Sequence, residues 1–283
     1  MAGRGASSAD RLLVAYFIAG AVAIALRRDH LAGWPYFVLL HAICIVVIVG
    51  LVWTAERWPA AHAWYPLAMA ILIFEEVALL NFMFVGEWQD RHVLGFEEAL
   101  FGEPPAQWLA RFASPIVTEL LAVGYFSYYL MLPAVGAVLY RRRENAAFEA
   151  FMSATMLAFI VCYAIFVTFP TEGPRHTLSH LHTEPLSGGP VWSAVLFIQS
   201  SAGVHGNAFP SAHAAGAMVA LVFAWRYAQP LAWWMLPFVL LMCVGAVHLR
   251  YHYASDMIAG VLIGAIACGY LRSRRRDGPP TTS

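Results

Sequence analysis

Asn207-Ala208-Phe209-Pro210-Ser211-Ala212-His213 opens one apolar segment of this chain, and His248-Leu249-Arg250-Tyr251-His252-Tyr253-Ala254-Ser255-Asp256 closes the next. The two segments, at about 209–227 and 231–249, are close to the roughly 20 residues that a helix needs to cross a bilayer. A hairpin of two such helices returns the chain to the side on which it began. We therefore expect both polar clusters at one face of the molecule, where they would form a site.

Composition places the chain in a membrane. Of its 283 residues, 60% are hydrophobic and only 12% are charged, and the mean hydropathy is +0.64. These values lie outside the range of soluble globular domains. The sequence predicts an all-α integral membrane protein with about eight transmembrane helices, at 10–26, 32–54, 64–85, 114–140, 148–169, 209–227, 231–249 and 254–271.

The arginines predict how these helices are oriented. All 17 basic residues are arginine, and clusters lie at 141–143 and at 272–276. The positive-inside rule puts both clusters, and with them both termini, in the cytoplasm. The polar site then faces the extracytoplasmic side of what we expect to be a bacterial inner or plasma membrane. Arg27 and Arg28 fall on that outer side as well, against the rule.

The first polar cluster has the pattern of a helix start. Pro210 and Ser211 precede an apolar run, and the serine can cap the helix that follows. The free N–H groups of the first turn, at Ser211 and Ala212, form a natural anion site, with His213 beside it. This pattern favours a bound phosphate at the membrane surface.

The second cluster adds a base and positive charge. His252 and Asp256 are four residues apart, and a carboxylate beside an imidazole fixes its tautomer and raises its basicity. Arg250, together with Arg175 from the preceding helix end, offers planar donor forks suited to phosphate. One of the two imidazoles, of His213 and His252, could attack phosphorus while the other protonates the leaving oxygen. We therefore expect phosphoryl transfer with no metal and no cofactor.

Three motifs in this order resemble those of the phosphatidic acid phosphatase type 2 superfamily, which includes the vanadium haloperoxidases. They are Gly173-Pro174-Arg175, Pro210-Ser211-Ala212-His213 and the pair His252 and Asp256. The resemblance implies that His252 is the nucleophile and forms a phosphohistidine, that His213 is the general acid, and that Asp256 orients His252. It also implies a lipid phosphate or phosphodiester as substrate.

Two departures from the motifs of the common members indicate which branch of that superfamily the chain resembles. Thr168 and Ala246 stand where the common members carry basic residues. The chain is therefore most similar to the branch that includes inositol phosphorylceramide synthase and many bacterial relatives. That branch contains phosphotransferases, so both a lipid phosphatase and a headgroup phosphotransferase remain open, with water or a lipid alcohol as acceptor.

Two other functions compete with this interpretation. Glu75 and Glu76 lie inside a predicted span, where ionisable groups must face the bundle interior. They indicate either a proton or ion path of a transporter, or a packing device in which the carboxyl group is protonated or paired with an arginine. His248, His252 and Asp256 recur every four residues and could form a metal site. Three tyrosines of the span at 114–140 (Tyr125, Tyr128 and Tyr129) are interpreted as packing or interface residues. The loop histidines His180, His182 and His205 are interpreted as solvated.

We divide the chain into three parts. Residues 1–60 form an accessory transmembrane hairpin, residues 61–272 a six-helix catalytic core, and residues 273–283 a basic cytoplasmic tail. Within the core, residues 88–112 alternate aromatic and charged side chains, which predicts short helices at the membrane interface. The expected partners are the lipid phosphate substrate and membrane lipids. A net charge of zero gives no indication of nucleic acid, and a homo-oligomer is compatible with the sequence.

Overall fold

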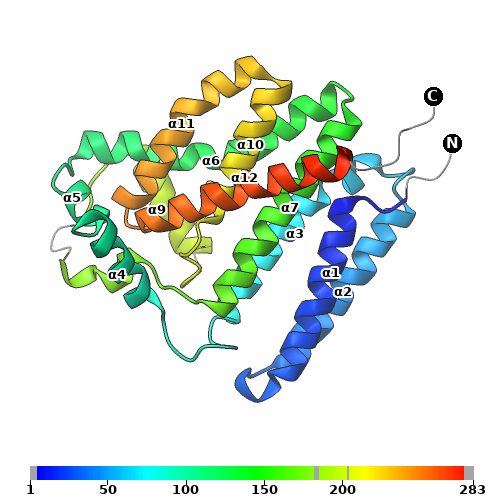
Figure 1. Ribbon diagram of the computed structural model, residues 1–283, viewed down its shortest axis with the longest axis horizontal. Coiled ribbons are helices and arrows are strands. Elements are labelled where there is room, and N and C mark those ends of the chain that lie inside the picture. Colours follow the sequence, from blue (N-terminus) through cyan, green and yellow to red (C-terminus); the bar gives the residue numbers. More distant parts are fainter. Residues whose placement is uncertain (1–4, 182–184, 203, 277–283) are drawn as a thin grey trace.

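The computed structural model describes residues 5–181, 185–202 and 204–276, and every regular element in that part of the chain is a helix (Figure 1). His182 and part of the predicted basic tail, residues 277–283, lie outside the described residues. The α-helices are α1 (Ser8–Leu26), α2 (Trp34–Trp53), α3 (Pro59–Leu79), α4 (Asp90–Phe101), α5 (Pro105–Ala110), α6 (Pro115–Arg141), α7 (Asn145–Thr168), α8 (Pro174–Thr177), α9 (Pro190–Ala202), α10 (Ala212–Tyr227), α11 (Gln229–His248) and α12 (Ala254–Arg276).

Seven of these helices are long and apolar enough to cross a membrane, namely α1, α2, α3, α6, α7, α11 and α12. The sequence predicted eight, and α10 is the difference. It has 16 residues, or about 24 Å of helix against a hydrocarbon core of about 30 Å. Its start is fixed by the Ser211 side chain, which accepts a hydrogen bond from the Ala214 N–H, so the residues at 209–211 that the prediction included are not helical.

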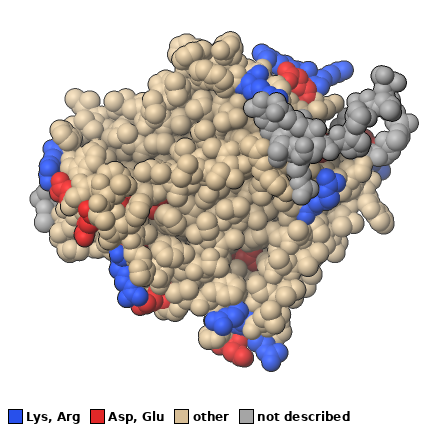
Figure 2. Space-filling model, viewed as in Figure 1, with Lys and Arg blue, Asp and Glu red and all other residues tan. Residues whose placement is uncertain are grey.

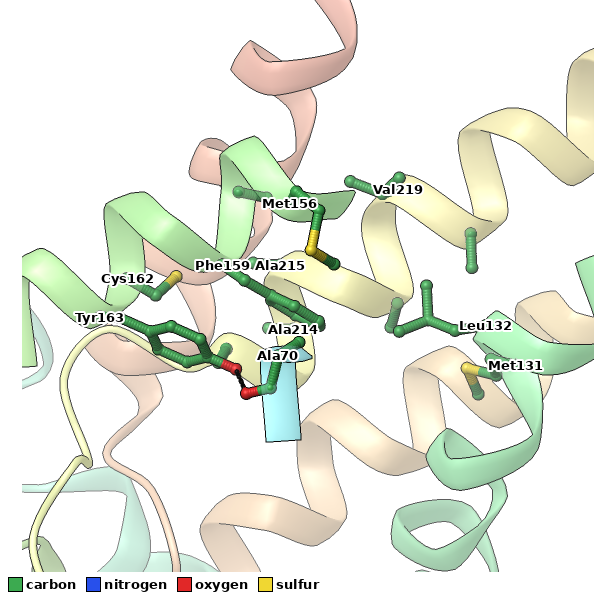
Figure 3. Close-up of a cluster of buried hydrophobic side chains, with 14 of the residues drawn as sticks. Ala70, Met131, Leu132, Met156, Phe159, Cys162, Tyr163, Ala214, Ala215 and Val219 are labelled. Atoms are coloured by element: carbon green, nitrogen blue, oxygen red, sulfur yellow. Dashed lines mark hydrogen bonds between the residues drawn. The ribbon is translucent and has the colours of Figure 1, made fainter. Parts of the chain in front are cut away.

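Helix α7 is the centre of the bundle. Of its apolar window 72% is buried, compared with 17% for α2. It packs against α1 and α3 on one side and against α10 and α12 on the other (Figure 1). Figure 3 shows Met156 and Phe159 of α7 beside Ala214, Ala215 and Val219 of α10. The small residues of α10 let the neighbouring helices come close.

Helix α12 crosses α10 at a very short distance because it carries glycine at the crossing. A Cβ atom on Gly260 would lie 2.9 Å from the Cβ of Ala214 and closer still to the carbonyl oxygen of Ser211. The same contact recurs one turn later, where a Cβ on Gly264 would lie 2.5 Å from the Ala215 carbonyl oxygen. This close approach brings the first turns of α10 and α12 together.

The N-terminal hairpin is fastened to the bundle by a buried polar contact. The His41 ring lies between the Phe17 carbonyl oxygen (Nδ1, 2.9 Å) and the Glu76 carboxylate (Nε2, 2.8 Å). Both side chains are at most 2% exposed. Glu76 is therefore a packing device that joins α3 to α1 and α2, with a histidine rather than an arginine as its partner.

The segment between α3 and α6 contains two short helices, as predicted. Helix α4 exposes Phe96, Leu100 and Phe101 and turns Asp90 and Glu97 inward. Its 12 residues cannot span a bilayer, whereas an outer side that mixes large apolar residues with the charged Arg91 and Glu98 suits the membrane surface. In Figure 2 the charged side chains gather mostly at the margins of the molecule and leave a broad uncharged face between them.

Candidate active site

The structure brings the two predicted polar clusters together. His213 lies in the first turn of α10, and His252 lies in the short loop that leads into α12. The centroids of the two imidazole rings are 5.7 Å apart, with an angle of 64° between the ring planes. The N–H of Ser211 donates to the carbonyl oxygen of Asp256 at 3.0 Å, which joins the starts of the two helices.

The tautomer of His252 is set by its surroundings. Its Nδ1 atom lies 2.9 Å from the Ala208 carbonyl oxygen and 3.3 Å from Oδ2 of Asp256. A carbonyl oxygen can only accept, so Nδ1 carries the hydrogen and Nε2 keeps its lone pair. Asp256 is fully buried and also accepts the Tyr253 N–H at 2.8 Å. The side-chain contact predicted from the four-residue spacing is present, although His252 precedes the helix.

His213 lies among three tyrosines of α6. Its ring centroid is 4.5 Å from that of Tyr128, 5.4 Å from that of Tyr125 and 6.4 Å from that of Tyr129. These tyrosines were interpreted as packing residues, but they line the same cavity as His213. Their spacing of three and four residues was the signal, because it puts the three phenol rings on one helix face.

Arg175 lies at the beginning of α8 and points into the same cavity. Its guanidinium carbon is 5.5 Å from the ring centroid of Tyr251, which in turn stacks on Tyr125 at 5.0 Å. Burial raises the pKa of Tyr251 to about 12, so the phenol stays neutral. The predicted arginine is thus held against a neutral aromatic platform.

Two other predicted residues are placed differently from the expectation. Ser211 is fully buried and uses its N–H and its hydroxyl within the protein, whereas Ala212 does line the cavity. Arg250 is not among the described residues that form the cavity wall. Its backbone has a φ of 67°, and burial and then the nearby charge of Arg175 lower its pKa from the ordinary value. Of the four residues predicted to bind phosphate, Arg175 and Ala212 therefore line the cavity.

The metal site expected as an alternative does not form. His248 is buried in α11 and its Nε2 lies 3.4 Å from the hydroxyl oxygen of Thr118. Among the described residues, His248, His252 and Asp256 do not make a group of converging ligand atoms. The regular spacing was misleading because α11 ends at His248 and α12 begins only at Ala254.

Asp90 joins the segment that carries Arg175 to the segment that carries His252, and it was not identified from the sequence. Its carboxylate accepts the N–H groups of Glu172 (2.7 Å) and Gly173 (2.8 Å) and the hydroxyls of Thr177 (3.0 Å) and Tyr253 (2.8 Å). The first three donors belong to the segment that carries Arg175, and the fourth is the neighbour of His252. A single buried carboxylate thus fixes the relative positions of these segments.

Glu97 acts in the same way two turns further along α4. It is fully buried and accepts the N–H and the hydroxyl of Ser255 at 2.9 and 3.2 Å. These donors lie in the first turn of α12, next to Asp256. Burial raises the pKa of Glu97. The seven-residue spacing of the two carboxylates puts them on one face of α4, and that spacing was the available signal.

A cavity of about 840 Å³ is lined by the predicted site residues Arg175, His213 and His252 together with apolar side chains. Its polar end contains Arg175, His213 and His252. The rest is mostly apolar and lies between α3, α6, α7 and α9, with Leu67, Ile71, Phe74, Leu132, Phe159, Phe166, Leu196 and Phe197 in its wall. Glu75 also lines the cavity, while its neighbour Glu76 points to His41.

Comparison with known proteins gives one family. Residues 91–270 match the family model described as the PAP2 superfamily. Searches of the curated proteins and of the solved structures gave no match. The matched range begins in α4 and contains Arg175, His213, His252 and Asp256, while α1 to α3 lie before it.

Proposed function

This chain belongs to the PAP2 superfamily, and we propose that it is a membrane lipid phosphatase or phospholipid headgroup phosphotransferase that works through a phosphohistidine. Membership of this superfamily supports phosphatase activity in general terms. The observation that carries the finer proposal is the pair of imidazoles, 5.7 Å apart, one of which has its Nδ1 hydrogen directed at a backbone carbonyl. That arrangement leaves a nucleophilic nitrogen facing the shared cavity.

In the proposed first step, Nε2 of His252 attacks phosphorus in line with the leaving oxygen. A bond between nitrogen and phosphorus forms as the bond to that oxygen breaks, and His213 gives its proton to the leaving group. The Ala208 carbonyl and Asp256 stabilise the positive charge that develops on the His252 ring. Arg175 and the first amide of α10 at Ala212 hold the equatorial oxygens.

In the second step, an acceptor hydroxyl attacks the phosphohistidine. His213, now neutral, takes the acceptor's proton, and the bond between Nε2 and phosphorus breaks. Water as the acceptor gives a phosphatase, and a lipid alcohol gives a phosphotransferase. No bound metal is needed in either step, because the arginine and the amide dipole supply the positive charge.

The apolar part of the cavity supports a lipid as the substrate. Its volume falls in the range of ligand pockets, about 300–1,000 Å³, and is far more than one phosphate group requires. Ile71 and Phe197, both in its wall, are 67% and 71% exposed, so the apolar part reaches the outer surface of the helices that would face lipid. A tail could enter there while the phosphate reaches the histidines. No observation favours the transporter alternative, since Glu76 is paired with His41.

The test is a panel of lipid phosphates and phosphodiesters offered to the purified protein. We expect phosphate release or a new lipid product in the presence of EDTA. We also expect inhibition by vanadate, which mimics the five-coordinate phosphorus of the transition state. His252→Ala should abolish turnover, whereas the matched control His180→Ala should not. Full turnover by His252→Ala, or activity that disappears on chelation, would remove the proposed mechanism.

A further inference from the structure

Two histidines and a glutamate gather in the wall of the cavity, outside the groups used in the proposed reaction. Glu172, His176 and His205 each offer one ligand atom, and these atoms lie within 4.8 Å of one another. All three residues line the cavity. They come from two segments that are separated in the sequence by α9. Glu172 and His176 flank Arg175 closely in the chain, and His205 precedes the start of α10.

The three side chains already contact one another. Nε2 of His205 lies 2.7 Å from Oε1 of Glu172, and the rings of His176 and His205 stack with centroids 4.6 Å apart. A metal ion between Nε2 and Oε1 would replace the shared proton, which would move to Nδ1 of the same ring or to water. Tetrahedral zinc, with bonds of about 2.0–2.1 Å, keeps its ligand atoms about 3.3 Å apart, so only a small movement of the exposed His176 is required.

The surrounding structure fixes two of these ligands in place. The N–H of Glu172 donates to Asp90 at 2.7 Å. The ring of His205 stacks on Trp88 with centroids 5.4 Å apart, and its carbonyl oxygen accepts the Asn81 amide at 3.0 Å. Such outer contacts orient ligands for metals and reduce the entropy lost on binding. The backbone of Glu172 and the ring of His205 are therefore held in position before a metal ion binds.

We propose that Glu172, His176 and His205 form a binding site for one divalent transition metal ion, with Zn²⁺ as the best fit. Two imidazoles and a single carboxylate favour zinc and its neighbours over Mg²⁺ or Ca²⁺, which prefer a shell of oxygen ligands. Three protein ligands leave the fourth position open, and the cavity adjoins it. An anion such as a phosphate oxygen is the chemical class that this position would take, with Arg175 nearby. This site does not depend on the proposed reaction.

The test measures metal binding alone, with the full-length protein purified without a polyhistidine tag and stripped with a chelator. Cobalt(II) serves as the probe because a tetrahedral site gives it a visible absorption band. We expect one equivalent of Co²⁺ to bind per chain and Zn²⁺ to displace it. His205→Ala and Glu172→Gln should each weaken binding by more than about tenfold, since loss of even an outer contact costs that much.

The control is His180→Ala, which removes an exposed histidine of the short 3-10 helix at Ser179–Leu181 that is not part of the cluster; it should bind Co²⁺ like the wild type. His176→Asn provides a second ligand variant should His205→Ala fail to elute as a folded protein in gel filtration. Absence of a tetrahedral Co²⁺ band in the wild type would overturn the site. So would equal affinity in the wild type and in the folded ligand variants, or an equal loss in His180→Ala.

Discussion

At the scale of single residues, the orientation of His252 depends on the backbone as much as on its acid partner. Nδ1 is nearer to the Ala208 carbonyl oxygen (2.9 Å) than to Asp256 (3.3 Å). The carbonyl selects the tautomer, and the buried carboxylate adds negative charge next to the ring. We therefore expect Asp256 to act mainly through its charge, unlike the carboxylate of a triad that alone fixes the imidazole.

At Arg175, the effect of the planar guanidinium can be distinguished from the effect of its positive charge. Arg175→Lys keeps the charge but replaces a planar fork with a single ammonium group, so we expect kcat to fall by more than about tenfold. Steady-state kinetics with the best lipid of the panel measures this. Arg250→Lys is the matched control. We expect its kcat to fall less than that of Arg175→Lys, because Arg250 is not among the residues of the cavity wall. Equal losses in both variants would contradict this assignment.

The sequence indicated four of the residues that the structure brings together, namely Arg175, His213, His252 and Asp256. Each lies in a short motif with a fixed spacing, and such motifs can be recognised in a sequence without knowledge of the fold. The use of Ser211 could not be predicted, because its N–H is taken by the Asp256 carbonyl oxygen only when Gly260 lets α12 approach α10. The spacing of the tyrosines around His213 predicted their shared helix face, but that this face lines the cavity depends on how α6 packs.

At the scale of elements, α4 connects the membrane surface with the site. Its outward side exposes the apolar residues Phe96 and Leu100 beside charged residues such as Glu98. Its inward face carries Asp90 and Glu97, which hold the Arg175 segment and the first turn of α12. A segment predicted only to form short helices at the membrane interface thus positions both halves of the site. Its sequence pattern predicted the location, but the partners of its carboxylates belong to segments far away in the chain.

Asp90→Asn tests this positioning role. An amide group would present a donor to at least one of the four donors that the carboxylate now accepts, which costs about 1–3 kcal/mol. We expect a lower melting temperature and, well below it, a weaker inhibition by vanadate, because Arg175 is no longer held. Glu98→Gln, on the exposed face of α4, is the matched control and should behave like the wild type. If Asp90→Asn lost only thermal stability and kept its vanadate affinity, Asp90 would have no positioning role.

Gly260→Ala tests the crossing of α10 and α12. The added methyl group collides with the backbone at Ser211, so the helices must separate, at a cost of about 1–3 kcal/mol. We expect a lower melting temperature together with lower activity, since the contact between Ser211 and Asp256 would break. Gly269→Ala lies in the same helix with nothing within 4 Å of its new methyl group, and it should leave both properties unchanged. Tolerance of both substitutions would show that the close crossing is not required.

At the scale of the whole molecule, the all-helical membrane architecture followed from composition, and seven of the predicted spans meet the structural criteria. The contact that fastens the first hairpin did not follow, because His41 and Glu76 lie on different helices and no local pattern pairs them. Arg27, which the predicted orientation places on the outer side, makes two contacts with the segment after α3. Its Nε donates to the Met83 carbonyl oxygen at 3.0 Å, and its guanidinium packs over Phe84, so it serves a structural contact beyond α3.

The predicted orientation can be measured by cysteine labelling in intact cells. Ser187→Cys lies in the exposed loop before α9, next to Leu186, and Arg143→Cys lies in the exposed turn between α6 and α7. We expect a membrane-impermeant maleimide to label Ser187→Cys from outside and to label Arg143→Cys only after permeabilisation. The unsubstituted protein, whose four cysteines lie in membrane-spanning helices, gives the background. The opposite pattern would reverse the topology.

The most direct test of the whole account is to trap the covalent intermediate. The purified protein is mixed with a ³²P-labelled lipid phosphate in EDTA, quenched within one turnover under alkaline conditions, and digested for peptide mapping. The account predicts an acid-labile phosphate on the peptide that contains His252, and no label in His252→Ala. Label on another residue, or turnover with no labelled protein at any time, would contradict it.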